Sequence, residues 1–226
     1  MRKKVRKKVT KLEMKWVETT IAMDTVNWKG GSIHLEGVKA LENKKTGAVR
    51  IFPDEIAKAE VRNIAEKYGL LPRDVGTLLI ILAKPGNFQE GDLFFKYHLQ
   101  KMLFYFWKEL VDTYGSDELF PKDNFIAAEN GPVPEHMDDD LVRLEKEDLI
   151  TTRYEKRDNG KSKRILLTDK GTTLAKELWS DLPDPYKEDA MKVKERLFLM
   201  SPERVRHLVH QQYPEYKNTY VKNDIE

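Results

Sequence analysis

The sequence predicts an α+β fold in which helices dominate, and three observations lead to this prediction. The chain has 226 residues, which is enough to bury a hydrophobic core. Before residue 53, short apolar runs partly alternate with polar residues, as strands do, whereas apolar residues three and four apart indicate helices over most of the rest. Turn and cap residues separate these segments.

Composition narrows the class of protein. Forty Lys and Arg residues against 38 Asp and Glu residues leave a net charge of +2, so bulk charge does not mark a nucleic-acid binder. The absence of cysteine excludes disulfides, thiol nucleophiles and Cys-ligated zinc, and it fits a cytoplasmic protein. The apolar run 78–83 is far shorter than the ~20 residues of a membrane helix, so we expect no membrane partner.

The chain begins with a predicted basic tail, 1–15, in which eight basic residues and one acid lie between Arg2 and Lys15. The runs 19–23, 32–38 and 48–52 follow it, separated by turn-forming residues. Their partial alternation predicts a small antiparallel meander.

A helical hairpin is predicted to complete a first domain, 16–86. Its first helix begins at Pro53 and ends at Gly69, and its second runs from Pro72 to Ala83. The following Lys-Pro-Gly-Asn sequence stops the second helix and places the domain boundary at 86.

The second predicted domain, 87–182, starts with a helix over 93–114 that is apolar around most of its circumference and should be buried. An extended segment, a Gly-Pro-Val-Pro turn, a helix and two strands around an Asn-Gly turn follow, at 125–128, 131–134, 135–148, 149–154 and 163–167. Thr168 caps the next helix. A helix, a hairpin and a returning strand in this order, from Phe94 to Trp179, are typical of a winged helix.

Two more helices are predicted within 183–226, the second with Ser201 as its N-cap. The aromatic run 104–107 in the helix over 93–114 is expected in the core, with a homodimer contact as the alternative.

Three segments of the second domain resemble the Panacea domain, a family that includes the SocA-like antitoxins. They are the helix with Gln100 and Lys101, the segment ending in Gly131-Pro132-Val133-Pro134, and Leu144 with Leu149-Ile150. The resemblance covers about residues 93–180, and its most specific element is the spacing between the Gln-Lys helix and the Gly-Pro-Val-Pro turn. A Leu-Thr-x-Lys-Gly pattern at 167–171 is also similar to PadR- and MarR-like winged-helix regulators. The resemblance implies an antitoxin-like protein that binds and neutralises a toxin encoded beside it.

The charges of the helix 135–148 favour a protein partner over the major groove of DNA. Seven acids in this range accompany only Arg143 and Lys146. Phosphates repel such a surface, although acids in a first turn also stabilise a helix by opposing its dipole. The residues predicted to bind the partner are Glu135, Asp138, Asp139, Arg143 and Glu145.

The hairpin has the opposite charge and supplies the alternative function, a winged-helix regulator that binds double-stranded DNA. A wing that contacts phosphates is basic, but charged strands also discourage edge pairing. The candidate residues are Arg153, Lys156, Arg157, Lys161, Lys163 and Arg164. The tail would add nonspecific affinity. A helix pair over 64–80 has the spacing of a helix-turn-helix, although its Leu and Ile residues favour a packing hairpin.

No motif predicts an enzyme, a cofactor or a metal site. His207 and His210 share a helical face but lack a carboxylate at metal-motif spacing. Asp138, Asp139 and Asp140 diverge by about 100° each along a helix, so they do not converge on one ion. The chain has no nucleophile elbow and no phosphate-binding Gly-Lys-Ser/Thr loop. We therefore expect a non-enzymatic binding protein.

Overall fold

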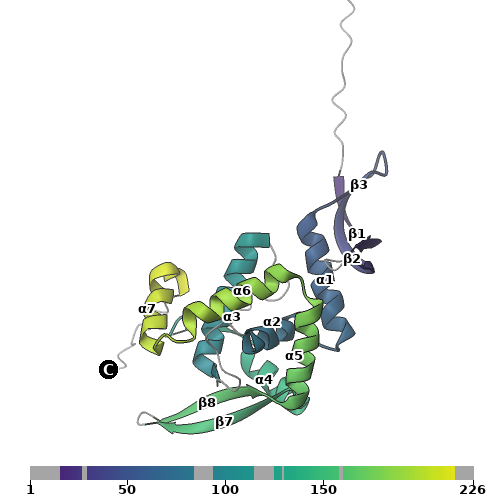
Figure 1. The fold of residues 1–226 in the computed structure, drawn as a ribbon. Coiled ribbons are helices and arrows are strands. Elements are labelled where there is room, and N and C mark those ends of the chain that lie inside the picture. The colour runs from purple at the N-terminus through teal and green to yellow at the C-terminus, as the bar shows by residue number, and fades with distance from the viewer. Residues whose placement is uncertain are drawn as a thin grey trace, which may run out of the picture. The chain divides into compact units, whose positions relative to one another are not determined.

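The computed structural model describes residues 16–26, 30–83, 94–114, 125–128, 130–157 and 160–216. The predicted basic tail lies outside these ranges. The described elements are mostly helices with small sheets, which confirms the α+β class (Figure 1). The chain divides into two compact units, and the division falls after Ala59, within helix α1 (Pro53–Lys67).

The first unit is an antiparallel meander followed by the first turns of α1. Strands β1 (Trp16–Val26), β2 (Ser32–Asn43) and β3 (Val49–Ile51) pair in that order, as the sequence predicts. Side chains along β1 alternate between exposed and half-buried, which matches the two faces of a strand. The unit has a small core, formed by Leu35, Val38 and Ala59 with Ile21, Met23, Ile33, Ile51 and Ile56 around them.

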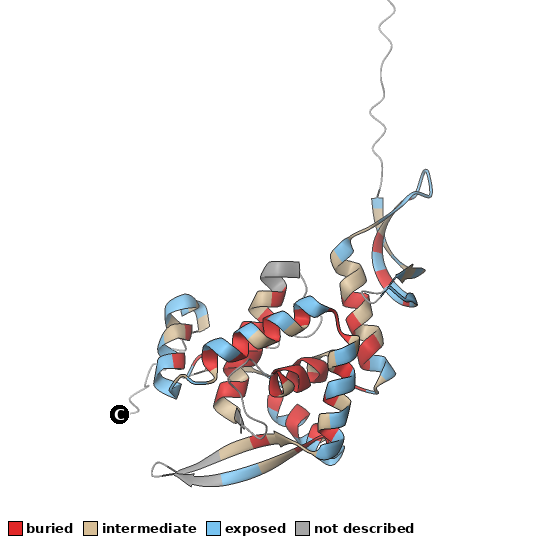
Figure 2. Cartoon of the chain, in the orientation of Figure 1, coloured by how far each residue is buried: buried red, intermediate tan, exposed pale blue. Residues whose placement is uncertain are grey.

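The second unit is built around helix α2 (Pro72–Leu82), which is buried from Asp74 to Ile81 (Figure 2). Helices α3 (Lys96–Tyr114), α5 (Asp169–Asp181) and α6 (Asp184–Leu197) pack against it. Helix α4 (Met137–Lys146) and helix α7 (Pro202–Gln212) add buried side chains to the same core, and a short 3-10 helix, Pro214–Tyr216, follows α7.

Two predicted domain boundaries are corrected by this core. The boundary expected at 86 separates α2 from helices that it packs against, and the separate region expected at 183–226 contributes Tyr186, Val193 and Val209 to the same cluster. The physical reason is the composition of α2, because a helix that is apolar on nearly all sides needs neighbours on all sides. A two-helix hairpin does not supply them.

A hairpin and two very short sheets complete the second unit. Strands β7 (Ile150–Arg157) and β8 (Gly160–Leu167) pair in the antiparallel direction, with Arg157 opposite Gly160. Strand β4 (Phe94–Phe95) pairs with β8, so the helix predicted from residue 93 begins only at Lys96. Strand β5 (Phe125–Ile126) pairs with β6 (Val133–Pro134). The predicted Asn-Gly turn lies partly outside the described residues.

Both predicted N-caps are confirmed. The Thr168 hydroxyl accepts a hydrogen bond from the Gly171 N–H at 2.9 Å, and the Ser201 hydroxyl accepts one from the Arg204 N–H at 3.3 Å. None of the helices in the described ranges is long and apolar enough to cross a membrane.

Candidate partner-binding surface

The Gly-Pro-Val-Pro turn is fixed to α3 by Lys101. This side chain is fully buried, and its Nζ donates a hydrogen bond to the Pro132 carbonyl oxygen at 2.7 Å. Burial lowers the pKa of Lys101 to about 7. Two parts of the sequence motif, 31 residues apart, are therefore joined by one hydrogen bond. Gln100 lies half-buried next to Lys101 on α3.

Gly131 is favoured by its backbone angle and lies close to α7. Its φ is +88°, which favours glycine, and a Cβ atom there would lie 3.0 Å from Cγ1 of Val209 on α7. The turn is thus held between α3 and α7. Val133 and Pro134 then form β6, which leads the chain directly into α4.

Helix α4 is held against α2 by a network of four charged residues. The Arg143 guanidinium donates two hydrogen bonds to the buried Asp74 carboxylate, at 2.6 and 2.5 Å. Arg143 also donates to Asp140 at 3.0 Å, and Asp140 accepts a further bond from Arg73 at 2.7 Å. The hydrogen bonds to Asp74 raise the pKa of Arg143. The network fixes the orientation of α4 on α2.

Arg143 therefore does not belong with the exposed residues predicted to bind a partner. Its guanidinium is turned inward toward Asp74, 69 positions earlier in the chain. The reason is electrostatic, because a fully buried carboxylate requires a cation or several hydrogen bonds. The sequence alone did not identify Asp74 as the partner of Arg143 or Arg73 as a partner of Asp140, although two charges in the first turn of so apolar a helix indicate that each needs a partner.

The outward side of α4 is acidic. We define the acidic face as Glu135, Asp138, Asp139, Val142 and Glu145, which are exposed and spaced by three and four residues. Asp138 pairs with Lys96 at the start of α3, and Glu145 accepts a hydrogen bond from the Thr152 N–H at 3.0 Å. Glu135 lies 3.8 Å from the ring of His136. Val142, 46% exposed, gives the face an apolar centre.

The Leu-Thr-x-Lys-Gly segment anchors the far end of α4. The Thr168 hydroxyl donates to the Asp148 carbonyl oxygen at 2.5 Å, and Lys170 Nζ donates to that of Glu147 at 2.6 Å. These bonds satisfy carbonyls just past the end of α4. A Cβ atom on Gly171 would lie only 1.7 Å from the Leu149 carbonyl oxygen, so this close approach requires glycine.

Among the predicted DNA-binding residues whose side chains the structure describes, Lys163 and Arg164 are half-buried and only Arg153 is exposed. Arg153 is exposed on β7, and its cross-strand neighbour Arg164 places its guanidinium 4.4 Å from the centre of the Phe95 ring. Lys163 is half-buried opposite the exposed Tyr154. The side chains of Lys156, Arg157 and Lys161 lie outside the described residues.

Two segments that the sequence allowed as alternative contact surfaces are buried. Val75 and the apolar residues that follow it on α2 lie in the core, so the helix pair over 64–80 is a packing hairpin and does not present a face to DNA. The aromatic residues 104–107 are also core, as the sequence predicts, so they are not available to form a homodimer interface.

On α7, His207 is exposed and His210 half-buried. Among the described residues, no three His, Asp or Glu side chains are placed to hold a metal ion.

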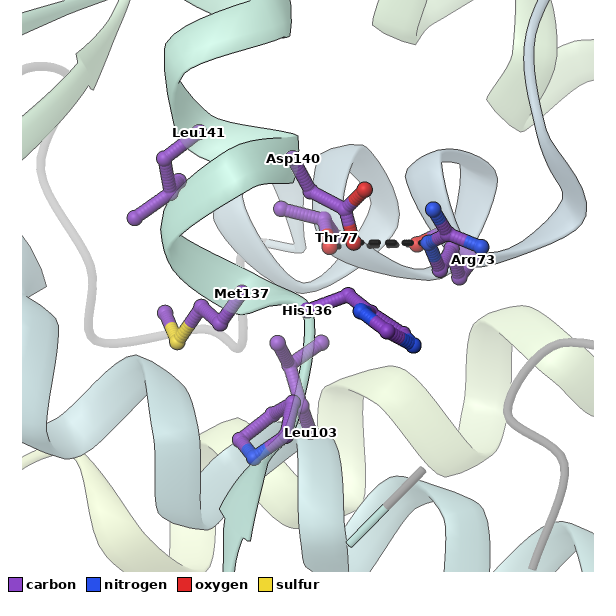
Figure 3. Close-up of a pocket in the computed structure, with 8 residues that line it drawn as sticks. Arg73, Thr77, Leu103, His136, Met137, Asp140 and Leu141 are labelled. Carbon is purple, nitrogen blue, oxygen red and sulfur yellow. Dashed lines mark hydrogen bonds and ion pairs between the residues drawn. The ribbon is translucent and has the colours of Figure 1, made fainter. Parts of the chain in front are cut away.

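A small pocket opens beside the first turn of α4, where α2, α3 and α4 meet (Figure 3). Its lining is mostly apolar, and the Arg73–Asp140 ion pair forms part of it. The lining residues are Arg73, Thr77, Leu103, Pro134, His136, Met137, Asp140 and Leu141.

Comparisons of the chain with family models, curated proteins and solved structures found no match.

Proposed function

We propose that the part of the second unit from β4 to α5 is a winged helix, and that the chain is a non-enzymatic, antitoxin-like protein that binds and neutralises a basic protein partner through the acidic face of α4. The observation that carries the proposal is the division of charge on α4. Its arginine is turned inward to Asp74, whereas four carboxylates of the acidic face point outward. The winged-helix assignment is supported by the order α3, α4, β7–β8 hairpin and α5, with β4 added to the hairpin.

The acidic face has the properties of a prepared binding surface. Helix α4 is tied to α2 by the Arg143 network and to α5 through Thr168 and Lys170, so little conformational freedom would be lost on binding. The carboxylates would attract a basic partner and orient its approach. Val142 supplies apolar contact at the centre, with charged residues around it, as in many protein interfaces.

DNA reading by α4 is disfavoured by the same charges. Groove-binding helices depend on attraction to phosphates, and carboxylates on the exposed side of α4 repel them. The resemblance of residues 93–180 to the Panacea domain implies that the partner of this surface is a toxin encoded beside the chain. That toxin would need a basic surface, which is a specific requirement of the proposal.

Co-expression with the product of the neighbouring gene tests the proposal. We expect the chain to restore growth to cells that this product inhibits, and Glu135→Lys with Asp139→Lys to abolish the rescue, because two attractive contacts become repulsive. The matched control is Glu188→Lys with Glu195→Lys, which makes the same change of charge at exposed positions of α6. Thermal melting of both variants checks that they remain folded. Failure of the unaltered chain to restore growth would refute the toxin assignment.

A second candidate function is DNA binding by the hairpin, which the exposed Arg153 and Tyr154 on β7 favour. This function would give an affinity for duplex DNA that falls steeply with salt, because released counterions drive phosphate contacts. Substituting Arg153, Arg157 and Lys161 by Ala should reduce the slope by about one for each phosphate that the variant no longer binds. An unchanged slope would count against the hairpin. The two functions are compatible, because they use different surfaces of the second unit.

A further inference from the structure

Strand β1 forms one edge of the sheet in the first unit, and among the described residues only β2 pairs with it. An edge strand directs every second N–H and C=O group away from its sheet, where another strand can bind them. We call this side of β1 its free edge. β1 runs over the 11 residues Trp16–Val26, whereas β3 at the opposite edge has only three. The free edge of β1 is therefore the longer site for an added strand.

The free edge lacks the lysines, prolines and bulges that keep edge strands of many proteins apart. β1 contains no lysine, arginine or proline. Its pairing with β2 is irregular between Ile21 and Met23, but two steps along β1 match three steps along β2, from Val38 to Leu35. The additional residue thus lies on β2. The backbone of β1 can accept a strand along its whole length.

The side of β1 that is turned toward the small core is incompletely covered. Ile21 and Met23 pack against this core but are only half-buried, whereas Leu35 and Val38 on β2 are fully buried. A core of this size gives a small unit little stability by itself, and association often supplies the remainder. A further strand beside β1 would remove more of the Ile21 and Met23 surface from water.

The residue pattern of β1 suits antiparallel pairing with its own copy. Side chains directly opposite each other interact most strongly, so like charges there are unfavourable. A two-fold axis at Ile21 would place Glu18 opposite Asp24 of the second copy. An axis at Thr20 or at Ala22 avoids this contact, because each acid then lies opposite an uncharged residue. Two registers are therefore free of direct charge repulsion.

Both registers also bring together apolar side chains on the core side of the strands. With the axis at Thr20, Val17 lies opposite Met23 of the second copy. With the axis at Ala22, Ile21 lies opposite Met23. Each contact occurs twice, because a two-fold axis makes the surface of one copy complementary to the same surface of the other. The pattern of β1 thus favours a second copy as the occupant of its free edge.

We propose that two copies of this chain pair along the free edges of their β1 strands and form one six-stranded sheet, in the order β3-β2-β1-β1-β2-β3. The inference goes beyond the proposed function and does not depend on it. A dimer of this kind would carry two acidic faces in one assembly.

Single-cysteine variants of the full chain test the contact, because the chain has no cysteine and any disulfide must join two copies. Thr20→Cys and Ala22→Cys each place a thiol on the two-fold axis in one of the two registers, where the opposed Cβ atoms lie near disulfide distance. In the other register the same thiols are about 13 Å apart along the strands and do not react. The control is Val49→Cys, at an exposed position of β3 on the opposite edge.

With oxidised glutathione as the oxidant, we expect one of the two β1 variants to form a covalent dimer and Val49→Cys to remain a monomer. The position that reacts identifies the register. Sedimentation equilibrium of the unaltered chain should give the mass of a dimer.

A charge variant measures the strength of the same contact. Thr20→Asp with Ala22→Asp creates three pairs of opposed carboxylates in either register, and both positions are exposed within the unit. Thr20→Asn with Ala22→Asn is the matched control, since it changes shape and strand propensity alike without adding charge. We expect the dissociation constant of the dimer to be at least about tenfold larger for the Asp variant than for the Asn variant.

The outcomes decide the proposal in either direction. Cross-linking at Thr20→Cys or Ala22→Cys alone would support it. Equal cross-linking of all three cysteine variants would indicate random collision and overturn it. A dimer mass without a cross-link at either β1 position would place the contact elsewhere, and a monomer mass without a cross-link would leave the edge unpaired. Either of these results would also refute pairing through β1.

Discussion

Lys101 shows how a single buried lysine can position the segment that leads into α4. Its Nζ meets the Pro132 carbonyl oxygen inside the core, and burial lowers its pKa to about 7. The turn that precedes α4 is thus fixed by a group whose charge depends on pH in the physiological range.

This pKa predicts a pH dependence of stability. The unfolded chain keeps Lys101 protonated up to its ordinary pKa of 10.5, whereas the folded protein releases this proton near pH 7. Between these values the unfolded state binds more protons, so rising pH stabilises the fold, by up to about 1.4 kcal/mol per pH unit. Lys101→Met should remove this contribution. Urea unfolding of both proteins between about pH 7.5 and 9.5 measures it, and parallel curves would contradict the assigned pKa.

Gly171 provides a second test at a single residue. A Cβ atom 1.7 Å from the Leu149 carbonyl oxygen cannot be accommodated unless α5 moves away from the end of α4. We expect Gly171→Ala to lower the free energy of unfolding by about 3 kcal/mol or more. Lys176→Ala, at an exposed position of α5, is the control and should change it by less than about 0.5 kcal/mol. If Gly171→Ala also changes the free energy of unfolding by less than about 0.5 kcal/mol, α5 does not approach the Leu149 carbonyl oxygen so closely.

At the scale of elements, α2 and α4 depend on each other through charge. In the first turn of α2, Asp74 accepts a hydrogen bond from the Leu71 N–H at 2.8 Å and two from Arg143. Helix α4 contributes both Arg143 and Asp140 to the same network. The inward side of α4 therefore carries charged residues, Asp140 and Arg143, as well as buried apolar residues.

Removing Arg143 should destabilise the second unit strongly. Arg143→Met leaves the buried carboxylate of Asp74 without its cation, and breaking a buried pair in this way costs about 3–5 kcal/mol. Lys146→Met, three residues later and exposed, removes the same charge from the same helix and should have little effect. Chemical denaturation compares the two variants. Similar midpoints for both would indicate that Arg143 is a surface residue, as its sequence context suggests.

Local signals in the sequence were sufficient for most of the elements. The three strands of the meander, the start of α1 at Pro53 and the caps Thr168 and Ser201 each follow from neighbouring residues. The acidic character of α4 follows from composition alone. The contacts of Arg143 and Lys101 do not, because they join residues 69 and 31 positions apart, and helical periodicity does not identify such partners.

At the scale of the whole molecule, the sequence misplaced the boundary between the two units. The Lys-Pro-Gly-Asn segment after α2 has the composition of a linker, yet the helices on either side of it share one core. A composition typical of loops indicates where an element ends, but burial of apolar surface decides which elements form a unit. The helical residues before the segment were therefore assigned to the wrong unit.

The net charge of +2 also conceals how charge is distributed in the second unit. The exposed side of α4 carries carboxylates, whereas the exposed basic residue Arg153 lies on the hairpin. One unit can thus offer surfaces of opposite charge to different partners. We propose that the first surface binds a basic protein, with the second as the alternative site for DNA.

The most direct test of this account is the dissociation constant of the complex with the product of the neighbouring gene, measured by titration calorimetry for two charge-reversed variants. Glu135→Lys with Asp139→Lys on the acidic face should weaken binding at least about tenfold relative to Glu188→Lys with Glu195→Lys on α6. The α6 variant should bind as the unaltered chain does. Equal dissociation constants for the two variants would contradict binding through the acidic face of α4.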